Sequence, residues 1–170
     1  MENVLNNQHS NFDKEIPIFL STDDNYIPFV DVTIRSIIAN ASKDYKYHIV
    51  VLNTGLDSSK TEKIKALEND NFRIEFKDIT YAVKDIEHKL PIESHFGLAC
   101  YYRLFIHILF PEYDKVLYLD CDIVVLGDVS ELYHTDLEGN YVAGVIENWI
   151  LHSPVFSHYT KEAVGIDCTE

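Results

Sequence analysis

The first half of the chain alternates between short apolar runs and stretches where apolar residues recur every three or four positions. The apolar runs predict strands at 16–21 (IPIFLS), 47–53 (YHIVVLN) and 72–76 (FRIEF). Helical spacing starts at Tyr26, with Pro28 suited to a first turn, and Ser58 or Ser59 would cap a second helix. The order β-α-β-α-β predicts an α/β fold with a mostly parallel central sheet flanked by helices.

The second half of the chain is less regular. Residues 96–110 (FGLACYYRLFIHILF) predict a buried helix ended by Pro111, with Arg103 off its apolar stripe and near Cys100 and His107. The apolar stripe comprises Leu98, Tyr102, Phe105 and Leu109. Strands are predicted at 116–119 (VLYL) and 141–147 (YVAGVIE). We expect residues 1–14 to form a flexible tail and residues 15–170 to belong to a single domain.

The net charge and the cysteine spacing limit which partners and which cellular compartment we expect for the protein. The 170 residues carry a formal net charge of −14, which disfavours nucleic acid and anionic membrane surfaces as partners and favours a cation. The three cysteines are widely spaced without a C-x-x-C pair, as is typical of reduced thiols in the cytoplasm. No apolar stretch reads as a signal peptide or a membrane span, so we expect a cytoplasmic protein.

Two aspartates follow the predicted strand at 116–119. In an extended segment, Asp120 and Asp122 would converge on one side while Cys121 turns to the other. Two carboxylates suit Mg²⁺ or Mn²⁺, and open α/β sheets bind ligands at the carboxyl ends of their strands. The alternative is an ordinary solvated turn, because turns favour Asp.

A second polar strand end, STDDNY, runs from Ser21 directly into a helix. Asp23 or Asn25 could bind a base or ribose, and Tyr26 could offer a stacking face. The alternative is helix capping by Asp23, Asp24 or Asn25. Two such strand ends in one sheet suggest a nucleotide with a metal on its phosphates. The chain has no G-x-G-x-x-G and no G-x-x-x-x-G-K-[ST], so neither a Rossmann site nor a P-loop is supported.

Three segments together, STDDNYIPFVDVTIRSI, YYRL and YDKVLYLDCDIVVLGDVSELYHTDLEGNYVAGVIE, resemble the N-terminal part of the family 8 glycosyltransferases. The resemblance runs from about residue 16 to residue 147. It implies a retaining, Mn²⁺- or Mg²⁺-dependent enzyme of the GT-A fold that transfers galactose or glucose from a UDP-hexose donor. The acceptor would be a saccharide or a lipid-linked saccharide, in bacterial surface polysaccharide such as lipopolysaccharide, with the enzyme cytoplasmic or peripheral at the inner face of the plasma membrane.

The resemblance also implies residue roles. Asp120 and Asp122 match the metal-binding pair, and Arg103 with Asp120 matches the catalytic positions that meet the donor sugar. His95 and Glu147 fall near positions facing the acceptor or donor sugar. The implied nucleotide and donor site consists of Ser21, Thr22, Asp23, Asn25, Tyr26, Arg103, Asp120, Cys121 and Asp122.

Other segments of the family do not occur in the sequence. Neither the H-x-x-G-x-x-K-P-W-like segment, with its third metal ligand, nor the FNxGxxxxN segment is present, so we expect these 170 residues alone to transfer weakly or not at all. Two alternatives stay open. LYLDCDIVV also fits the strand end of a haloacid-dehalogenase-like phosphatase, although Lys161 is the only lysine after Asp122. The chain could also be a catalytically silent sugar-nucleotide-binding domain.

Overall fold

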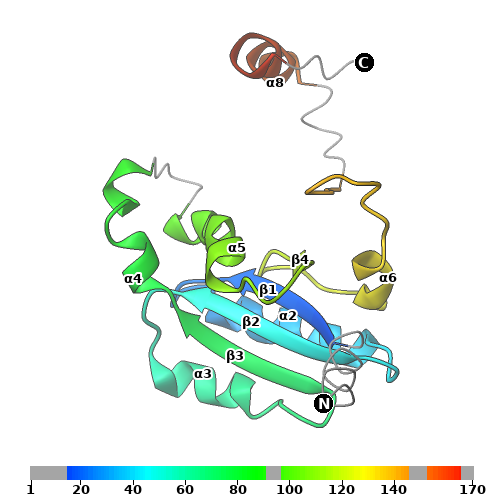
Figure 1. Cartoon of the computed structure of the whole chain (residues 1–170). Coiled ribbons are helices and arrows are strands. Elements are labelled where there is room, and N and C mark those ends of the chain that lie inside the picture. Colours follow the sequence, from blue (N-terminus) through cyan, green and yellow to red (C-terminus); the bar gives the residue numbers. More distant parts are fainter. Residues whose placement is uncertain (1–14, 91–96, 146–152, 166–170) are drawn as a thin grey trace, which may run out of the picture. The chain divides into compact units, whose positions relative to one another are not determined.

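The central sheet contains four parallel strands in the order β3-β2-β1-β4 (Figure 1). The computed structural model describes residues 15–90, 97–145 and 153–165. The strands are β1 (Glu15–Ser21), β2 (Lys46–Asn53), β3 (Phe72–Asp78) and the short β4 (Leu117–Tyr118). Since β1 pairs with β2 on one side and β4 on the other, its carboxyl end is flanked by two neighbouring strand ends.

Helices connect these strands and cover the sheet. Chain contacts divide the protein into two compact units, up to Thr135 and from Asp136 onward. The helices of the first unit are α2 (Ile27–Asn40), α3 (Ser58–Lys65), α4 (Thr80–Val83), η1 (Glu87–Lys89), η2 (Leu98–Phe105), α5 (Ile106–Leu109) and α6 (Val129–Tyr133). The second unit contains α8 (Pro154–Tyr159) and the π-helical turn η3 (Thr160–Val164).

Side chains of the sheet pack into a separate core on each face, because successive residues of a strand point to opposite sides. Ile16, Ile18 and Leu20 of β1 pack with buried residues of α2, α3 and α6. Phe19 packs on the other face with buried residues of α4, η2 and α5. The sheet is therefore the middle of three layers, and the predicted α/β class with a parallel sheet is confirmed.

The structure corrects three details of the predicted elements. Asp57, rather than Ser58 or Ser59, caps α3: its Oδ1 accepts a hydrogen bond from the backbone N–H of Ser59 at 2.9 Å. The segment 96–110 is not one buried helix. From residue 98 it is the 3₁₀ helix η2 followed by α5, and Leu104 and Ile108 are exposed because only one side of the segment meets the sheet.

The third correction concerns the strand predicted at 141–147. Residues 141–145 are irregular, with Tyr141 and Val145 almost fully exposed, and residues 146–147 lie outside the described residues. A strand needs a hydrogen-bonded neighbour, and no described segment pairs with 141–145. Alternating apolar residues alone therefore did not make a strand here. Across the described residues, no helix combines the length and the hydropathy needed to cross a bilayer.

Candidate functional site

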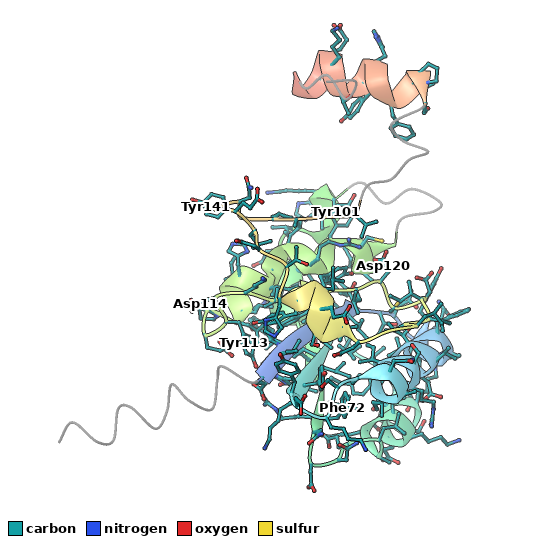
Figure 2. The ribbon with its side chains drawn as sticks, turned by 90° about the vertical axis from the view of Figure 1, so that its right-hand side faces the viewer. Phe72, Tyr101, Tyr113, Asp114, Asp120 and Tyr141 are labelled. Atoms are coloured by element: carbon teal, nitrogen blue, oxygen red, sulfur yellow. The ribbon has the colours of Figure 1, made fainter. Side chains whose placement is uncertain are left out.

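The candidate site is built on the carboxyl ends of β1 and β4. Phe19 and Tyr118 are partners in the parallel register, so the two strands end side by side. The hydroxyl oxygens of Ser21 and Tyr118 lie 2.6 Å apart. Figure 2 shows Asp120 at the opposite end of the first unit from Phe72, the first residue of β3. The two polar strand ends singled out in the sequence are therefore neighbours in space.

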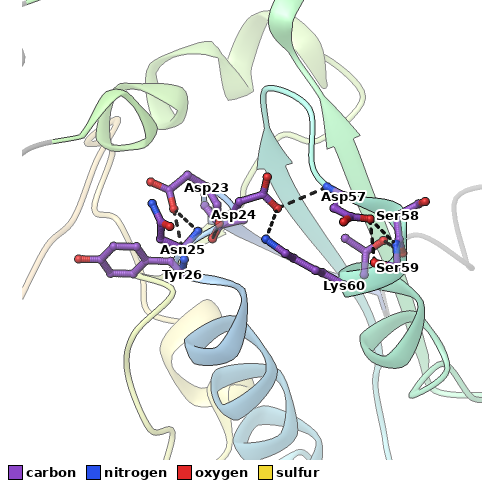
Figure 3. Close-up of polar contacts among 10 residues, drawn as sticks. Asp23, Asp24, Asn25, Tyr26, Asp57, Ser58, Ser59 and Lys60 are labelled. Carbon is purple, nitrogen blue, oxygen red and sulfur yellow. Dashed lines mark hydrogen bonds and ion pairs between the residues drawn. The ribbon is translucent and has the colours of Figure 1, made fainter.

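The turn between β1 and α2 uses Asp23 to hold its own backbone. Asp23 Oδ1 accepts hydrogen bonds from the backbone N–H of Asn25 at 2.8 Å and of Tyr26 at 3.2 Å (Figure 3). One carboxylate oxygen thus holds the turn ahead of α2, whereas α2 itself has Tyr26 as its N-cap and no side-chain cap, so the alternative of helix capping by Asp23, Asp24 or Asn25 is wrong. The ring of Tyr26 stays 45% exposed beside that of Phe29. A carboxylate bonded to its own turn and an exposed aromatic face therefore coexist in this segment.

Asp24 ties this turn to the start of α3, a link that the sequence did not reveal. Its Oδ1 accepts from Lys60 Nζ at 3.1 Å and from the backbone N–H of Asp57 at 3.4 Å (Figure 3). Asp57 in turn caps α3. The ion pair is exposed, so it adds little to folding stability, but it joins the loops after β1 and β2.

Arg103 of η2 lies over the strand end of β4. Its Nη2 donates to Asp120 Oδ1 at 3.2 Å, and its Nε donates to the carbonyl of Cys100 at 3.0 Å. The guanidinium carbon sits 4.2 Å from the ring centre of Tyr118, a cation–π contact. The sequence placed Arg103 away from the apolar stripe, on the side of Cys100, and the structure confirms that placement. The sequence did not reveal the contact between Arg103 and Tyr118. Its only signal was that an aromatic residue stands two positions before Asp120.

Hydroxyl pairs fix the surroundings of this arginine. The hydroxyls of Thr54, just after β2, and Tyr102 of η2 lie 2.7 Å apart. Tyr118 is held in the same way through Ser21, and burial raises its pKa above the ordinary value. η2 is therefore attached to the end of β2 through Tyr102, the residue before Arg103, and the Tyr118 ring that contacts Arg103 is attached to the end of β1.

The acidic pair lies in a turn rather than in a strand. β4 ends at Tyr118 and residues 121–122 form a turn, so the predicted extended geometry is wrong. Asp120 and Asp122 are nonetheless exposed, whereas Cys121 is partly buried against the core under α2. Burial, with a smaller contribution from the Asp122 charge, raises the pKa of the Cys121 thiol to about 11. Cys121 is therefore a thiol rather than a thiolate at neutral pH.

The donor chemistry of this turn fits a hard divalent cation only in part. Asp120 and Asp122 offer carboxylate oxygens, and Asp120 Oδ1 already accepts from Arg103. Within the described ranges, His, Cys, Asp and Glu side chains form no group of three that could hold a metal ion. Mg²⁺ is commonly held by one or two carboxylates and completed by water and substrate phosphates, so the pair suits such an ion. His95 and Glu147, the two further predicted site residues, lie outside the described residues.

Comparison with known proteins identifies the family. The sequence profile of glycosyl transferase family 8 matches residues 17–167. The lipopolysaccharide 1,2-glucosyltransferase of Escherichia coli K12 is 32% identical over 127 residues, covering 74% of this chain and 36% of that protein. Human glycosyltransferase 8 domain-containing protein 1 is 26% identical over 151 residues, covering 86% and 40%. The chain thus spans about two fifths of the length of such relatives.

Solved structures agree with the sequence comparison. The bifunctional glycosyltransferase WbbM superposes with a TM-score of 0.78 and 30% identity, covering 92% of this chain and 29% of that one. The galactosyltransferase LgtC, solved with donor and acceptor sugar analogues, superposes with a TM-score of 0.72 and 25% identity, covering 88% and 53%. The fold is therefore that of the GT-A transferases over a portion of their chains, as the sequence predicted. The chain belongs to glycosyl transferase family 8.

Proposed function

We propose that the protein of which these residues form the nucleotide-binding part is a retaining hexosyltransferase. It would transfer galactose or glucose from a UDP-sugar to a saccharide or lipid-linked saccharide acceptor, with Mn²⁺ or Mg²⁺ bound. The observation that carries the proposal is the placement of Arg103 against Asp120, where the polar ends of β1 and β4 meet. The names of two relatives, a lipopolysaccharide glucosyltransferase and a galactosyltransferase, support hexose as the sugar.

In this proposal the β1–α2 turn binds the nucleoside. The exposed ring of Tyr26 stacks on uracil, and Asn25 and the second carboxylate oxygen of Asp23 hydrogen-bond the base or ribose. The hydrogen bonds that the backbone N–H groups of Asn25 and Tyr26 donate to Asp23 Oδ1 hold the turn in one conformation before the ligand binds. Preorganisation of this kind lowers the entropy lost on binding. Ser21 and Thr22 are buried at the end of β1, directly before this turn, and would lie beneath the bound nucleoside.

The acidic turn would hold the divalent cation through Asp120 and Asp122. When bound, the cation neutralises the charge that develops on the departing diphosphate. The partly buried Cys121 keeps both carboxylates outside the core by turning inward between them. Remaining coordination sites would be filled by phosphate oxygens and water, since a carboxylate pair leaves an Mg²⁺-like ion incompletely coordinated.

Arg103 would orient the donor sugar. Its Nε and Nη2 are engaged by the Cys100 carbonyl and Asp120, so the planar group is held rigidly over Tyr118. A fixed guanidinium presents its remaining N–H donors in a defined direction. Holding the sugar near the reacting geometry lowers the barrier through positioning, without any proton transfer by the arginine.

The cellular setting is proposed on the same grounds. We place the protein in the cytosol, free or peripheral at the inner face of the plasma membrane, where it would help to build bacterial surface polysaccharide. The widely spaced cysteines, and the lipopolysaccharide named as the substrate of the Escherichia coli relative, support this setting. The net charge of −14 argues against tight association with anionic lipid headgroups or nucleic acid through this part of the chain.

A thermal-shift titration tests the nucleotide and metal sites together. UDP with Mn²⁺ should raise the melting temperature of the 170-residue chain, because a ligand at about 100 times its dissociation constant stabilises by roughly 2.7 kcal/mol. Asp122→Asn should abolish the Mn²⁺-dependent part of the shift. Asp114→Asn, an exposed carboxylate ahead of β4, is the matched control and should leave it unchanged.

The outcomes separate the proposal from its alternatives. No shift with UDP and Mn²⁺ in a folded chain would overturn the nucleotide site. Binding of UDP without hydrolysis of any UDP-hexose would favour a catalytically silent binding domain. Release of phosphate from phosphomonoesters without preference for UDP would favour the phosphatase alternative, although membership of a glycosyltransferase family decides against it. Comparing UDP-galactose, UDP-glucose and UDP-N-acetylglucosamine then identifies the donor.

A further inference from the structure

Helix α2 presents polar side chains to the backbone that follows β4. Thr33 and Ser36 lie one turn apart on α2, and Asn40 lies a further turn on. Each of them hydrogen-bonds the segment 121–125, more than 80 residues away in sequence. This segment starts with the turn that carries the acidic pair. A helix that covers the sheet is therefore also bonded to the loop at the edge of the candidate site.

Thr33 makes the contact closest to the carboxylates. Its hydroxyl lies 2.9 Å from the carbonyl oxygen of Cys121 and 2.7 Å from that of Ile123, and donates to both in a shared arrangement. These two carbonyls bracket Asp122. The Thr33 side chain is fully buried, so an unmatched carbonyl at this place would carry the cost of desolvation without compensation. The hydroxyl thus favours the one backbone conformation that satisfies both carbonyls.

Ser36 and Asn40 continue the attachment. The backbone N–H of Val125 donates to Ser36 Oγ at 2.9 Å, and Asn40 Nδ2 donates to the Val125 carbonyl at 2.9 Å. Strand β4 has already ended at Tyr118, so residues 121–125 have no strand ladder to fix their backbone. The side chains of α2 supply hydrogen bonds where a neighbouring strand would otherwise supply them.

We propose that Thr33 is a positioning residue for the acidic pair, with Ser36 and Asn40 supporting it. This inference rests on the proposed function, in which Asp120 and Asp122 bind a divalent cation. The same helix starts directly after Tyr26, so α2 connects the turn assigned to the nucleoside with the turn assigned to the metal. Groups that orient metal ligands typically change metal affinity by 10- to 100-fold when they are removed.

The test compares Thr33→Val with Thr33→Ser. Valine keeps the branched shape and removes the hydroxyl, whereas serine keeps the hydroxyl and removes a methyl group. Mn²⁺ affinity is measured in the presence of UDP from the electron paramagnetic resonance signal of free Mn²⁺. We expect Thr33→Val to weaken Mn²⁺ affinity about tenfold or more, and Thr33→Ser to remain near wild type.

A matched control removes a part-buried hydroxyl far from the acidic turn. Tyr113→Phe deletes a hydroxyl that bonds His48 and Glu15 at the amino end of the sheet, and it should leave Mn²⁺ affinity unchanged. If Thr33→Val fails to fold, Ser36→Ala replaces it, with a several-fold loss of affinity expected.

Equal Mn²⁺ affinity in wild type and in the folded Thr33→Val or Ser36→Ala chain would overturn the positioning role while leaving the proposed function intact. Absence of Mn²⁺ binding by the wild-type chain with UDP would overturn both. Equal loss in Thr33→Val and in Thr33→Ser, which keeps the hydroxyl, would show that Mn²⁺ affinity responds to any change in packing at this position, which would also overturn the role of the hydroxyl.

Discussion

The guanidinium of Arg103 stacks on the ring of Tyr118, with 4.2 Å between the guanidinium carbon and the ring centre. Tyr118 is the last residue of β4, and its hydroxyl lies 2.6 Å from that of Ser21 at the end of β1. Tyr118 therefore contacts both the end of β1, through Ser21, and Arg103 on the separate 3₁₀ helix η2, so that the strand ends fix the position of the arginine. This contact links the rigid sheet to the group that we assign to donor-sugar binding.

Substitutions of Tyr118 separate the ring from the hydroxyl. Tyr118→Phe keeps the stacking surface and should bind UDP-hexose as wild type, while losing about 1 kcal/mol of unfolding free energy because Ser21 loses its partner. Tyr118→Leu removes the aromatic face and should weaken UDP-hexose more than UDP. Isothermal titration calorimetry with both ligands measures this difference. Equal effects of Leu and Phe on the affinity for UDP-hexose would contradict the stacking role.

Arg103→Lys tests whether the planar group is needed. Lysine keeps the charge but cannot reach the Cys100 carbonyl, Asp120 and the sugar with one fixed fork. We expect UDP-hexose affinity to fall about tenfold relative to UDP, the size of one charge-assisted hydrogen bond. The melting temperature should change little, because the pair with Asp120 is exposed to solvent. Arg35→Lys on α2, also exposed and paired with a carboxylate, is the control.

Local patterns were sufficient to predict the first three strands and the β-α-β-α-β order of the elements. The apolar runs at 16–21, 47–53 and 72–76 all lie within observed strands, because both faces of a covered parallel sheet are buried. The outward carboxylates around an inward Cys121 were also expected, although a turn and not a strand produces them. The side chains divide in this way because the apolar thiol and the charged groups have opposite preferences for burial, and not because the backbone is extended.

The sequence could not indicate which residues meet across long separations. Thr33 in a helix looks like any other threonine until the chain folds and brings Cys121 and Ile123, some 90 residues away, to its hydroxyl. Tyr118 was correctly expected in a strand, but its contact with Arg103 depends on the fold in the same way. The strand predicted at 141–147 was wrong for 141–145, because pairing depends on a neighbour that the local pattern does not contain.

A polar cluster at the amino end of the sheet makes stability depend on pH. His48 is buried, with Nδ1 2.6 Å from the Tyr113 hydroxyl and Nε2 3.2 Å from Glu75 Oε2. Burial, and then the nearby Arg73 charge, lower the pKa of His48 below its ordinary value, against the opposing effect of the glutamates. Burial also raises the pKa of the Tyr113 hydroxyl to about 12, so that group stays neutral throughout the physiological range.

The unfolded chain therefore binds a proton at His48 before the folded chain does. The unfolding free energy should be constant above about pH 7.5 and should fall as the pH drops through the ordinary histidine pKa of about 6.5. Urea unfolding at a series of pH values measures this slope. His48→Gln should reduce the slope between pH 7.5 and 5, whereas His107→Gln, at an exposed position, should leave it as in wild type. An unchanged slope in His48→Gln would assign the pH dependence to other groups.

Asp128 joins α6 to the sheet through its carboxylate. It accepts hydrogen bonds from the backbone N–H and the hydroxyl of Ser130 and from the hydroxyl of Tyr47, at 3.1 Å for the backbone bond and 3.2 Å for the tyrosine. Burial would raise the pKa of Asp128, but the bonds from Ser130 lower it below its ordinary value. The carboxylate therefore stabilises the fold at neutral pH, and this stabilisation is lost as the pH falls through the lowered pKa.

Asp128→Ala should lower the unfolding free energy at pH 7 by about 1–2 kcal/mol, the usual cost of losing an N-cap. Tyr47→Phe removes the bond from β2 to Asp128, together with a bond to the Ser42 carbonyl, but leaves the cap on Ser130 in place, so it should cost less than Asp128→Ala. Asp114→Ala, at an exposed position, should change stability little. Urea denaturation at pH 7 and pH 3 measures all three. Because protonation removes the charge that the cap depends on, Asp128→Ala should approach wild type at pH 3, and a difference that persists undiminished there would contradict the charged-cap role.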